Sequence, residues 1–253
     1  MGEIHDTWPI DEFTLILPYY DQPGMLLRQS EEWDLYPAGV RVVVVDDGSP
    51  ASPADAVLPK NSRAELYRVG TDIPWNRNGA RNLGAKVAET DWILHADIDH
   101  ILPMASAMAI VGGREFDPMA WYRFARFRVG KADETRKKDE LPDDCERGPV
   151  KPHIDSFLCT RELYWRAGGY DEDFSGSIGG SAVFLKHMTQ DGGEPVVLTD
   201  ILLEVHTRHS VPDSSEPKLS RDRSRFERIR AEKRKAGDPK PATHIRFPWE
   251  RVR

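Results

Sequence analysis

The chain has 253 residues, of which 39% are hydrophobic and 30% charged, and a formal net charge of −7, a composition typical of a globular protein with a sizeable core. No apolar run approaches the ~20 residues of a membrane-spanning helix, and the acidic N-terminus lacks the basic and apolar regions of a signal peptide. The two cysteines predict neither a disulfide framework nor a zinc cluster and favour a reducing, cytoplasmic location.

Strand and helix patterns alternate in the first half of the chain. "FTLILPYY" (13–20) predicts a buried strand that is followed by a helix. "VRVVVVDDGSP" (40–50) lacks polar alternation, as does a parallel strand covered on both faces. "AELYRVG" (64–70) is a third strand, "NRNGARNLGAKVAET" (76–90) has one apolar helix face, and "DWILHADID" (91–99) returns to a strand. This β-α-β-β-α-β order predicts an α/β fold with a Rossmann-like, doubly wound, mostly parallel sheet.

The second half is less regular, although its elements still have recognisable ends. Thr160 begins a predicted helix, and Gly168 and Gly169 end it. The predicted elements are a strand at 120–130, a polar surface loop at 131–149, a strand and a helix within 155–174, a helix at 181–193, a strand at 194–210 and a helix at 220–237.

Positive charge is concentrated at the C-terminal end. From Lys218 onward there are thirteen Lys or Arg against five Asp or Glu, a net charge of +8 that leaves −15 for residues 1–217. A charged helix with only Phe226 and Ile229 as large apolar residues is either solvated or attracted to an anionic partner.

Polar clusters follow three of the predicted strands. "PYYD", "DDGS" and "DIDH" each begin where an apolar run ends. In a doubly wound sheet, ligands bind beyond the carboxyl ends of the strands, so these clusters are expected at one binding edge. The D-x-D pattern of Asp97 and Asp99 is weak alone, since these residues could instead cap the helix after Pro103.

Four segments occur in a familiar order and spacing: "TLILPYYDQ", "VVVVDDGSP", "NGARNLGAKVAETDWILHADID" and "RAGGYDEDFSGSIGG". Together they resemble the family 2 glycosyltransferases of the GT-A fold, including the galactosyltransferase-like C-terminal segment of some members. The resemblance covers roughly residues 13–190. It implies transfer of a sugar from a nucleoside diphosphate sugar to an acceptor hydroxyl, with inversion at the anomeric carbon and with Mn²⁺ or Mg²⁺ as cofactor.

The resemblance also implies roles for the residues of the first two clusters and of the 76–90 helix. Pro18 and Tyr19 would border the nucleobase, and Asp47, with Asp46 beside it, would accept hydrogen bonds from the base or ribose. Arg81 would face the diphosphate, to which a guanidinium offers a planar pair of donors. Alternatively, the two aspartates only shape a turn and the arginine is solvated.

A metal site is implied at the third cluster. Asp97 would lie near the ribose and the metal, and Asp99 would coordinate the metal, which stabilises the charge developing on the diphosphate leaving group. A downstream histidine often completes the site in related enzymes, and of His206 and His209 we favour His206, with a purely structural histidine as the alternative. His100 is left out because neighbouring side chains on a strand point to opposite faces.

One departure from the family pattern concerns the acceptor base. The family usually has an acidic pair where this chain has Ser181 and Ala182, and neither can act as a base at neutral pH. The nearest acidic candidates are Asp155, Asp171 and Asp173. Alternatively, the acceptor needs little help, or the protein binds a nucleotide sugar and transfers it slowly or not at all.

These observations predict a glycosyltransferase domain at 1–211, with a nucleotide-sugar half at about 10–103, an acceptor half at about 104–211, and a basic C-terminal extension at 212–253. The expected donor is a nucleoside diphosphate sugar, with UDP favoured. The acceptor is unidentified, with a phosphate-bearing polymer or DNA contacted by the basic extension as a minority hypothesis. The alternative function is a non-catalytic or weakly active nucleotide-sugar-binding protein.

Overall fold

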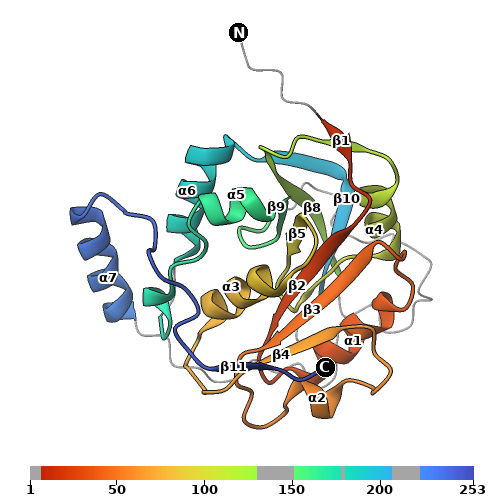
Figure 1. Ribbon diagram of the computed structural model, residues 1–253, viewed down its shortest axis with the longest axis horizontal. Helices are drawn as coiled ribbons and strands as arrows, with labels where there is room; N and C mark the ends of the chain where they lie inside the picture. The colour runs from red at the N-terminus through yellow and green to blue at the C-terminus, as the bar shows by residue number, and fades with distance from the viewer. Residues whose placement is uncertain (1–6, 130–150, 178–179, 207–222) are drawn as a thin grey trace.

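The computed structural model describes residues 7–129, 151–177, 180–206 and 223–253. A nine-stranded sheet crosses the molecule in the order β11-β4-β3-β2-β5-β9-β8-β10-β6 (Figure 1). Its strands are β2 (Phe13–Tyr19), β3 (Val40–Asp46), β4 (Glu65–Val69), β5 (Trp92–His95), β6 (His100–Ile101), β8 (Trp121–Val129), β9 (Phe157–Thr160), β10 (Val196–His206) and β11 (Trp249–Arg251). A separate two-stranded sheet pairs β1 (Trp8–Pro9) with β7 (Glu115–Phe116).

Helices lie against the sheet and around its ends (Figure 1). They are α1 (Pro23–Trp33), α2 (Ala54–Val57), α3 (Arg77–Val87), α4 (Met104–Val111), α5 (Arg161–Arg166), α6 (Ser181–Gly192) and α7 (Arg223–Lys235), with a 3₁₀ turn, η2 (Glu172–Phe174). α5 begins next to Thr160 as predicted, and Thr160 caps it, because its side chain accepts a hydrogen bond from the backbone N–H of Leu163.

Four neighbouring strands, β4, β3, β2 and β5, run parallel, and β8 and β10 form a second parallel pair. The other four pairings of the large sheet are antiparallel. The α/β prediction is therefore confirmed, with its parallel part at the N-terminal half. β3 is buried along nearly all its length, which explains its run of valines.

The strand predicted at 91–99 is shorter than expected. β5 ends at His95, and the chain then turns, with the backbone N–H of His100 donating to the carbonyl of Asp97 at 2.9 Å. The pattern missed β1, β6, β7 and β11, whose two or three residues are too few to show a local period and which form only through their partners.

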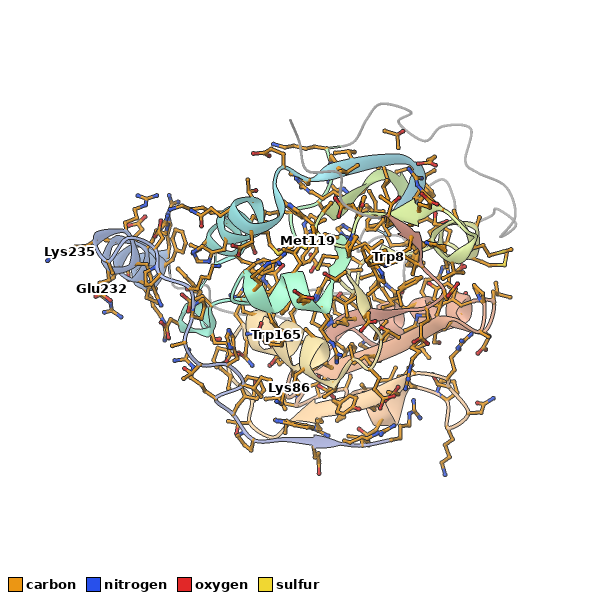
Figure 2. All side chains as sticks on the ribbon, turned by 45° about the horizontal axis from the view of Figure 1, so that its top comes forward. Trp8, Lys86, Met119, Trp165, Glu232 and Lys235 are labelled. Atoms are coloured by element: carbon orange, nitrogen blue, oxygen red, sulfur yellow. The ribbon has the colours of Figure 1, made fainter. Side chains whose placement is uncertain are left out.

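The basic C-terminal part is built into the same fold. β11 pairs antiparallel with β4 at the edge of the large sheet, and the Phe247 ring is buried in a core cluster with residues of β3, β4 and α3. α7 confirms the helix predicted at 220–237 and has no buried residues; Glu232 and Lys235 lie at the outer margin of the molecule (Figure 2). Ser220 and the predicted boundary at 211/212 lie outside the described residues.

The loop predicted at 131–149, which contains Cys145, also lies outside the described residues. Cys159 is a free, buried thiol. Within the described ranges, no helix has the length and apolarity that crossing a membrane would require.

The close packing of α3 against β2 supports the binding edge, and it can be tested at Gly84. A Cβ atom on Gly84 would lie 2.3 Å from Cγ2 of Ile16, an atom that cannot swing away because it branches next to the backbone. Alanine favours a helix by about 1 kcal/mol over glycine, but the overlap forces α3 away from the sheet. We expect Gly84→Ala to lower the free energy of unfolding by about 1–3 kcal/mol.

Urea unfolding monitored by circular dichroism measures this change. Lys86→Ala, at an exposed position of the same helix (Figure 2), is the matched control and should stay within about 0.5 kcal/mol of the wild type. A Gly84→Ala protein as stable as the control would contradict the close approach of α3 to β2.

Candidate functional site

The three predicted polar clusters meet at one edge of the sheet, because β3, β2 and β5 are parallel neighbours. The loops leaving these strands are also bonded to β2: the backbone N–H of Asp47 donates to the Tyr19 carbonyl at 2.8 Å, and that of Ala96 to the Ile16 carbonyl at 3.2 Å. This is the edge at which open α/β sheets bind ligands.

Two of the predicted donor residues shape the loop after β3. Asp46 is buried, and its carboxylate accepts from the backbone N–H groups of Ser49 at 2.8 Å and Ala54 at 2.9 Å. The buried Tyr19 donates its hydroxyl to the carbonyl of Ser52 at 2.6 Å. Both side chains therefore hold the backbone of this loop in place. For Asp46 this agrees with the alternative that the aspartate shapes a turn.

Asp47 lies deeper in the edge than expected. The residue is 4% exposed and its carboxylate accepts from Nδ2 of Asn76 at 3.0 Å, and burial raises its pKa well above the ordinary value. Pro18 and Tyr20 are half-buried nearby, with the Tyr20 hydroxyl donating to Asp72 at 3.1 Å. Pro18 and Tyr20 thus supply apolar and polar surface at the end of β2, whereas Asp47, which follows β3, is nearly buried.

Arg81 has no exposed surface, which excludes a solvated helix arginine. Its Nη2 contacts Asp97 directly and lies 3.7 Å from Oδ2 of Asp155, while its guanidinium stands 5.1 Å from the centre of the Tyr170 ring. Burial alone would lower the pKa of Arg81, but the two carboxylates outweigh it and raise the pKa. Nε and Nη1 have no hydrogen-bond partner within the described part of the chain.

Asp155 joins α3 to the start of α6. It is 1% exposed, accepts from the Tyr170 hydroxyl at 2.9 Å and from Ser181 Oγ at 3.0 Å, and lies 3.6 Å from a terminal nitrogen of Arg77. Ser181 therefore stands where the family pattern expects a carboxylate, and it donates a hydrogen bond to a carboxylate from elsewhere in the chain. Of the three predicted base candidates, Asp155 is the one that contacts the Arg81–Asp97 pair.

Asp97 also approaches two histidines. Its Oδ2 is 3.5 Å from Nδ1 of His153, and potential ligand atoms of Asp97, His100 and His153 all lie within 4.8 Å of one another. Burial would raise the pKa of Asp97, but Arg81 and then His153 lower it below its usual range. Burial lowers the pKa of His100 to about 3 and also lowers that of His153. A charged carboxylate beside two neutral imidazoles is a donor set that fits a divalent metal ion.

The other predicted metal ligands, Asp99 and His206, are joined through their backbones. The backbone N–H of His206 donates to the carbonyl of Asp99 at 2.9 Å, which brings the end of β10 beside Asp99 as the prediction requires. The His206 side chain, however, lies with Nε2 3.0 Å from the carboxylate of Glu204. The helix-capping alternative for the D-x-D pair is excluded, because Pro103 is the N-cap of α4 and no side chain caps it. His209 lies outside the described residues.

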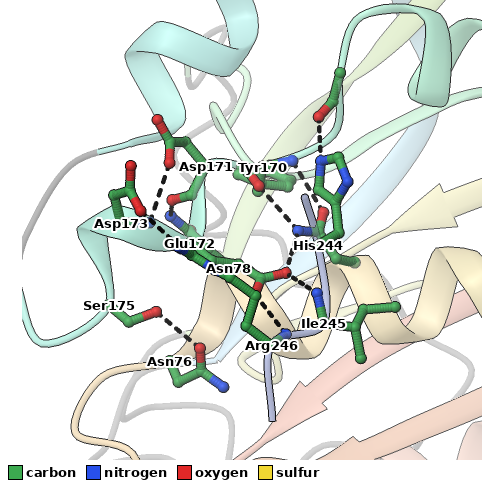
Figure 3. A network of polar contacts seen from close by, with 12 residues as sticks. Asn76, Asn78, Tyr170, Asp171, Glu172, Asp173, Ser175, His244, Ile245 and Arg246 are labelled. Carbon is green, nitrogen blue, oxygen red and sulfur yellow. Dashed lines mark hydrogen bonds and ion pairs between the residues drawn. The ribbon is translucent and has the colours of Figure 1, made fainter. Parts of the chain in front are cut away.

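Asp171 and Asp173 face the C-terminal segment. Lys233 of α7 lies 2.8 Å from Asp171 and 2.5 Å from Asp173. Arg246 donates to Asp173 at 2.8 Å (Figure 3). Asp171 also caps η2, because its side chain accepts from the backbone N–H of Asp173. In this structure the two carboxylates hold α7 and the last residues against η2, and their role as bases stays a prediction.

Three residues of the site were not assigned to it from the sequence. Arg77 lies one helical turn before Arg81, and its side chain is 32% exposed, which makes it a more accessible cation. His100 was set aside on the assumption of an extended strand, but the turn at 97–100 returns it to the side of Asp97. His153 comes from more than fifty residues downstream, and no local pattern pointed to it.

Comparisons with known proteins give a structural match only. No family model matches the chain, and no curated protein does. S. aureus TarS residues 1–349 matches with a TM-score of 0.57 and 16% identity, over 78% of this chain and 61% of that one. TarS 1–349 in complex with UDP-GlcNAc matches with a TM-score of 0.58 and 16% identity, over 81% and 61% of the two chains. TarS 1–349 in complex with UDP matches with a TM-score of 0.55 and 16% identity, over 78% and 60%.

The chain has the GT-A fold. At 16% identity the likeness shows the fold alone, and the chain covers about three fifths of TarS 1–349. The galactosyltransferase-like character of the C-terminal segment stays a prediction.

The buried charges of the site give a stability test. Asp155→Asn keeps the shape of the side chain but leaves the buried Arg81 with one carboxylate neighbour fewer. We expect a loss of about 3 kcal/mol in the free energy of unfolding, because a buried charge loses a partner. Asp173→Asn, which removes a charge of a 40% exposed side chain, is the control and should cost less than about 1 kcal/mol. Chemical denaturation of both variants measures the difference, and equal losses would refute the central role of Asp155.

Proposed function

We propose that this protein is a glycosyltransferase that moves a sugar from a nucleoside diphosphate sugar, UDP being the favoured nucleotide, to an acceptor hydroxyl. The proposal includes inversion at the anomeric carbon, use of a divalent cation, and a cytoplasmic location. Its main support is the convergence of Asp47, Asp97 and the Arg77–Arg81 face of α3 at the carboxyl edge of the parallel strands in a GT-A fold. S. aureus TarS, which shares that fold, has been crystallised with UDP and with UDP-GlcNAc.

The donor contacts are assigned from their place at the ends of the parallel strands, and from exposure and charge for all but the buried Asp47. Asp47 and Pro18 are the proposed contacts to the base and ribose, with Tyr20 in place of the buried Tyr19. Asp97, 20% exposed and charged, is the proposed ribose and metal contact. Arg77 is the proposed cation for the diphosphate, because Arg81 lies behind Asp97 with no exposed surface.

The transfer step needs a proton acceptor and a stabilised leaving group. The acceptor oxygen attacks the anomeric carbon, the bond from that carbon to the phosphate oxygen breaks, and the hydroxyl proton passes to a base. A divalent cation supplies charge stabilisation to the departing diphosphate. We propose Asp155 as the base, reached through the Ser181 hydroxyl, which donates to Oδ2 at 3.0 Å. Because both groups are nearly buried, transfer through them requires the start of α6 to open.

That requirement favours a second candidate function. Asp155 already accepts two hydrogen bonds and faces two arginines, so it is well suited to a structural role. A protein with such a site could bind a nucleotide sugar and transfer it slowly or not at all. Donor turnover across a broad acceptor panel separates the two candidates, and measurable transfer excludes the second.

Donor binding can be tested with matched arginine variants. Calorimetry with UDP-GlcNAc and MnCl₂ should give binding to the wild type, and Arg77→Met should weaken it about tenfold or more, since a charge-assisted hydrogen bond contributes about 1.5–3 kcal/mol. Arg41→Met is the control, because Arg41 lies near the start of β3, at the opposite end of that strand from the site, and pairs with Glu65 and Glu89. The proposal fails if UDP-, GDP- and dTDP-sugars all leave the protein unbound.

The basic helix gives a test of the acceptor hypothesis. Several cationic side chains of α7 form ion pairs with carboxylates elsewhere in this chain, such as Lys233 with Asp171 and Arg230 with Asp238. The exposed Arg228, Arg234 and Lys235 are the proposed contacts for a phosphate-bearing polymer.

If this hypothesis is right, the protein binds duplex DNA or a polyphosphate at low salt, and the affinity falls steeply as salt is added. Changing these three residues to Gln should reduce the slope of log Kd against log salt by about two to three. Fluorescence anisotropy measures both slopes. Lack of binding at low salt removes the anionic polymer as an acceptor while leaving the donor proposal intact.

A further inference from the structure

We infer that the divalent cation is held by Asp97, His100 and His153, and that this site accepts Mn²⁺ in preference to Mg²⁺. The inference rests on the proposed function for its biological meaning, but it concerns the ligand set and can be measured with the metal alone. It replaces Asp99 and His206, which the sequence resemblance implies as ligands, with two histidines whose ring nitrogens lie near the Asp97 carboxylate.

The geometry of the three side chains suits one ion. Ligand atoms at about 2.1 Å from a metal lie at most about 4.2 Å from one another. The three potential ligand atoms here lie within 4.8 Å, and Asp97 Oδ2 is 3.5 Å from Nδ1 of His153. Side-chain shifts of roughly half an ångström would bring all three atoms onto one ion.

The hydrogen bonds of His100 also suit a metal, which binds only an unprotonated ring nitrogen. His100 is 3% exposed. Its Nδ1 lies 2.7 Å from Ser156 Oγ, and its Nε2 lies 3.3 Å from a terminal nitrogen of Arg126. Since arginine only donates, Nε2 accepts and the ring proton is on Nδ1, where it is donated to Ser156.

This arrangement resembles the usual environment of a metal-binding histidine. The nitrogen that does not bind the metal normally donates to a nearby oxygen, which fixes the ring orientation. Ser156 provides that oxygen, and Arg81 orients Asp97 by binding Oδ1, while His153 lies near Oδ2. The Arg126 guanidinium lies beside Nε2, so a metal ion bound to this nitrogen takes the place of Arg126.

The donor set determines which cation is preferred. Mg²⁺ strongly favours oxygen ligands and retains several waters, whereas Mn²⁺ and the later transition metals accept imidazole nitrogen. Two imidazoles and one carboxylate therefore disfavour Mg²⁺ and leave coordination positions for phosphate or water oxygens. By contrast, His206 is directed to Glu204, and within the described ranges it belongs to no cluster of three potential ligands.

The test measures Mn²⁺ binding to the full chain by electron paramagnetic resonance of the free ion, without donor or acceptor. His153→Gln, at a side chain 26% exposed, should weaken Mn²⁺ binding by about tenfold or more, whereas Asp99→Asn and His206→Gln should keep the wild-type affinity. An excess of Mg²⁺ should fail to displace Mn²⁺, and Zn²⁺ should displace it, as expected from the order of divalent affinities.

Two further variants, with a check of their folding, separate loss of a ligand from loss of the fold. His100→Gln removes a buried ligand and should abolish binding, and Ser156→Ala removes only the group that orients His100 and should cause a smaller loss, about tenfold. Circular dichroism and the melting temperature of each variant without metal show whether it is folded. The inference is overturned if Asp99→Asn or His206→Gln loses Mn²⁺ while a folded His153→Gln keeps it, or if the same excess of Mg²⁺ displaces Mn²⁺.

A separate measurement distinguishes this inference from the proposed function. UDP-GlcNAc binding in the presence of EDTA, followed by calorimetry, reports the donor site without the metal. Mn²⁺ binding that depends on His153, without nucleotide-sugar binding either in EDTA or with saturating MnCl₂, supports the inference and refutes the function. Donor binding together with Mn²⁺ binding that depends on Asp99 supports the function and refutes the inference.

Discussion

The buried ion-pair cluster around Arg81 is the interaction on which the binding edge depends. A guanidinium without exposed surface costs several kcal/mol of desolvation unless it is well paired, so Asp97 and Asp155 are constrained to stay beside it. Arg81 belongs to α3, Asp97 to the loop after β5, and Asp155 to the segment before β9. One charge therefore holds three distant parts of the chain together at the carboxyl ends of the parallel strands.

The C-terminal segment is attached by a different balance of forces. Phe247 and the backbone bonds of β11 fix its last residues to the sheet, and these interactions depend little on salt. α7, which has no buried residues, is held to η2 partly by ion pairs such as Lys233 with Asp173, and exposed pairs of this kind contribute little and weaken in salt. The excess of positive charge at the C-terminal end is thus partly used to attach the segment to the acidic turn at 171–173.

The sequence predicts those parts of the molecule whose cause is local. β2, β3, β4 and α3 have dense apolar patterns, and the polar residues that follow the parallel strands necessarily share an edge. Asp47 and Asp97 could therefore be assigned to one site from sequence. The burial of Arg81 could not, because its carboxylate partners come from residues 16 and 74 positions away.

The same limit applies to His100 and His153. The position of His100 depends on a turn closed by one backbone hydrogen bond, and "DIDH" at the end of an apolar run is equally compatible with a longer strand. His153 reaches Asp97 through the packing of a segment that has no periodic pattern of its own. Similarly, β11 has three residues and exists because β4 offers a free edge to it.

The charge of the site also gives a physical reason for the serine at position 181. Arg77 and Arg81 bring two positive charges, and Asp97 and Asp155 balance them with two negative ones. A carboxylate at position 181 would lie against Asp155, where Ser181 Oγ is now 3.0 Å from Oδ2, and two buried carboxylates at that distance cannot both stay ionised. A hydroxyl at this position instead donates to Asp155 and leaves the charge balanced. The missing acidic pair and the buried Asp155 are therefore two aspects of one arrangement, in which the carboxylate at the start of α6 is supplied by a different segment of the chain.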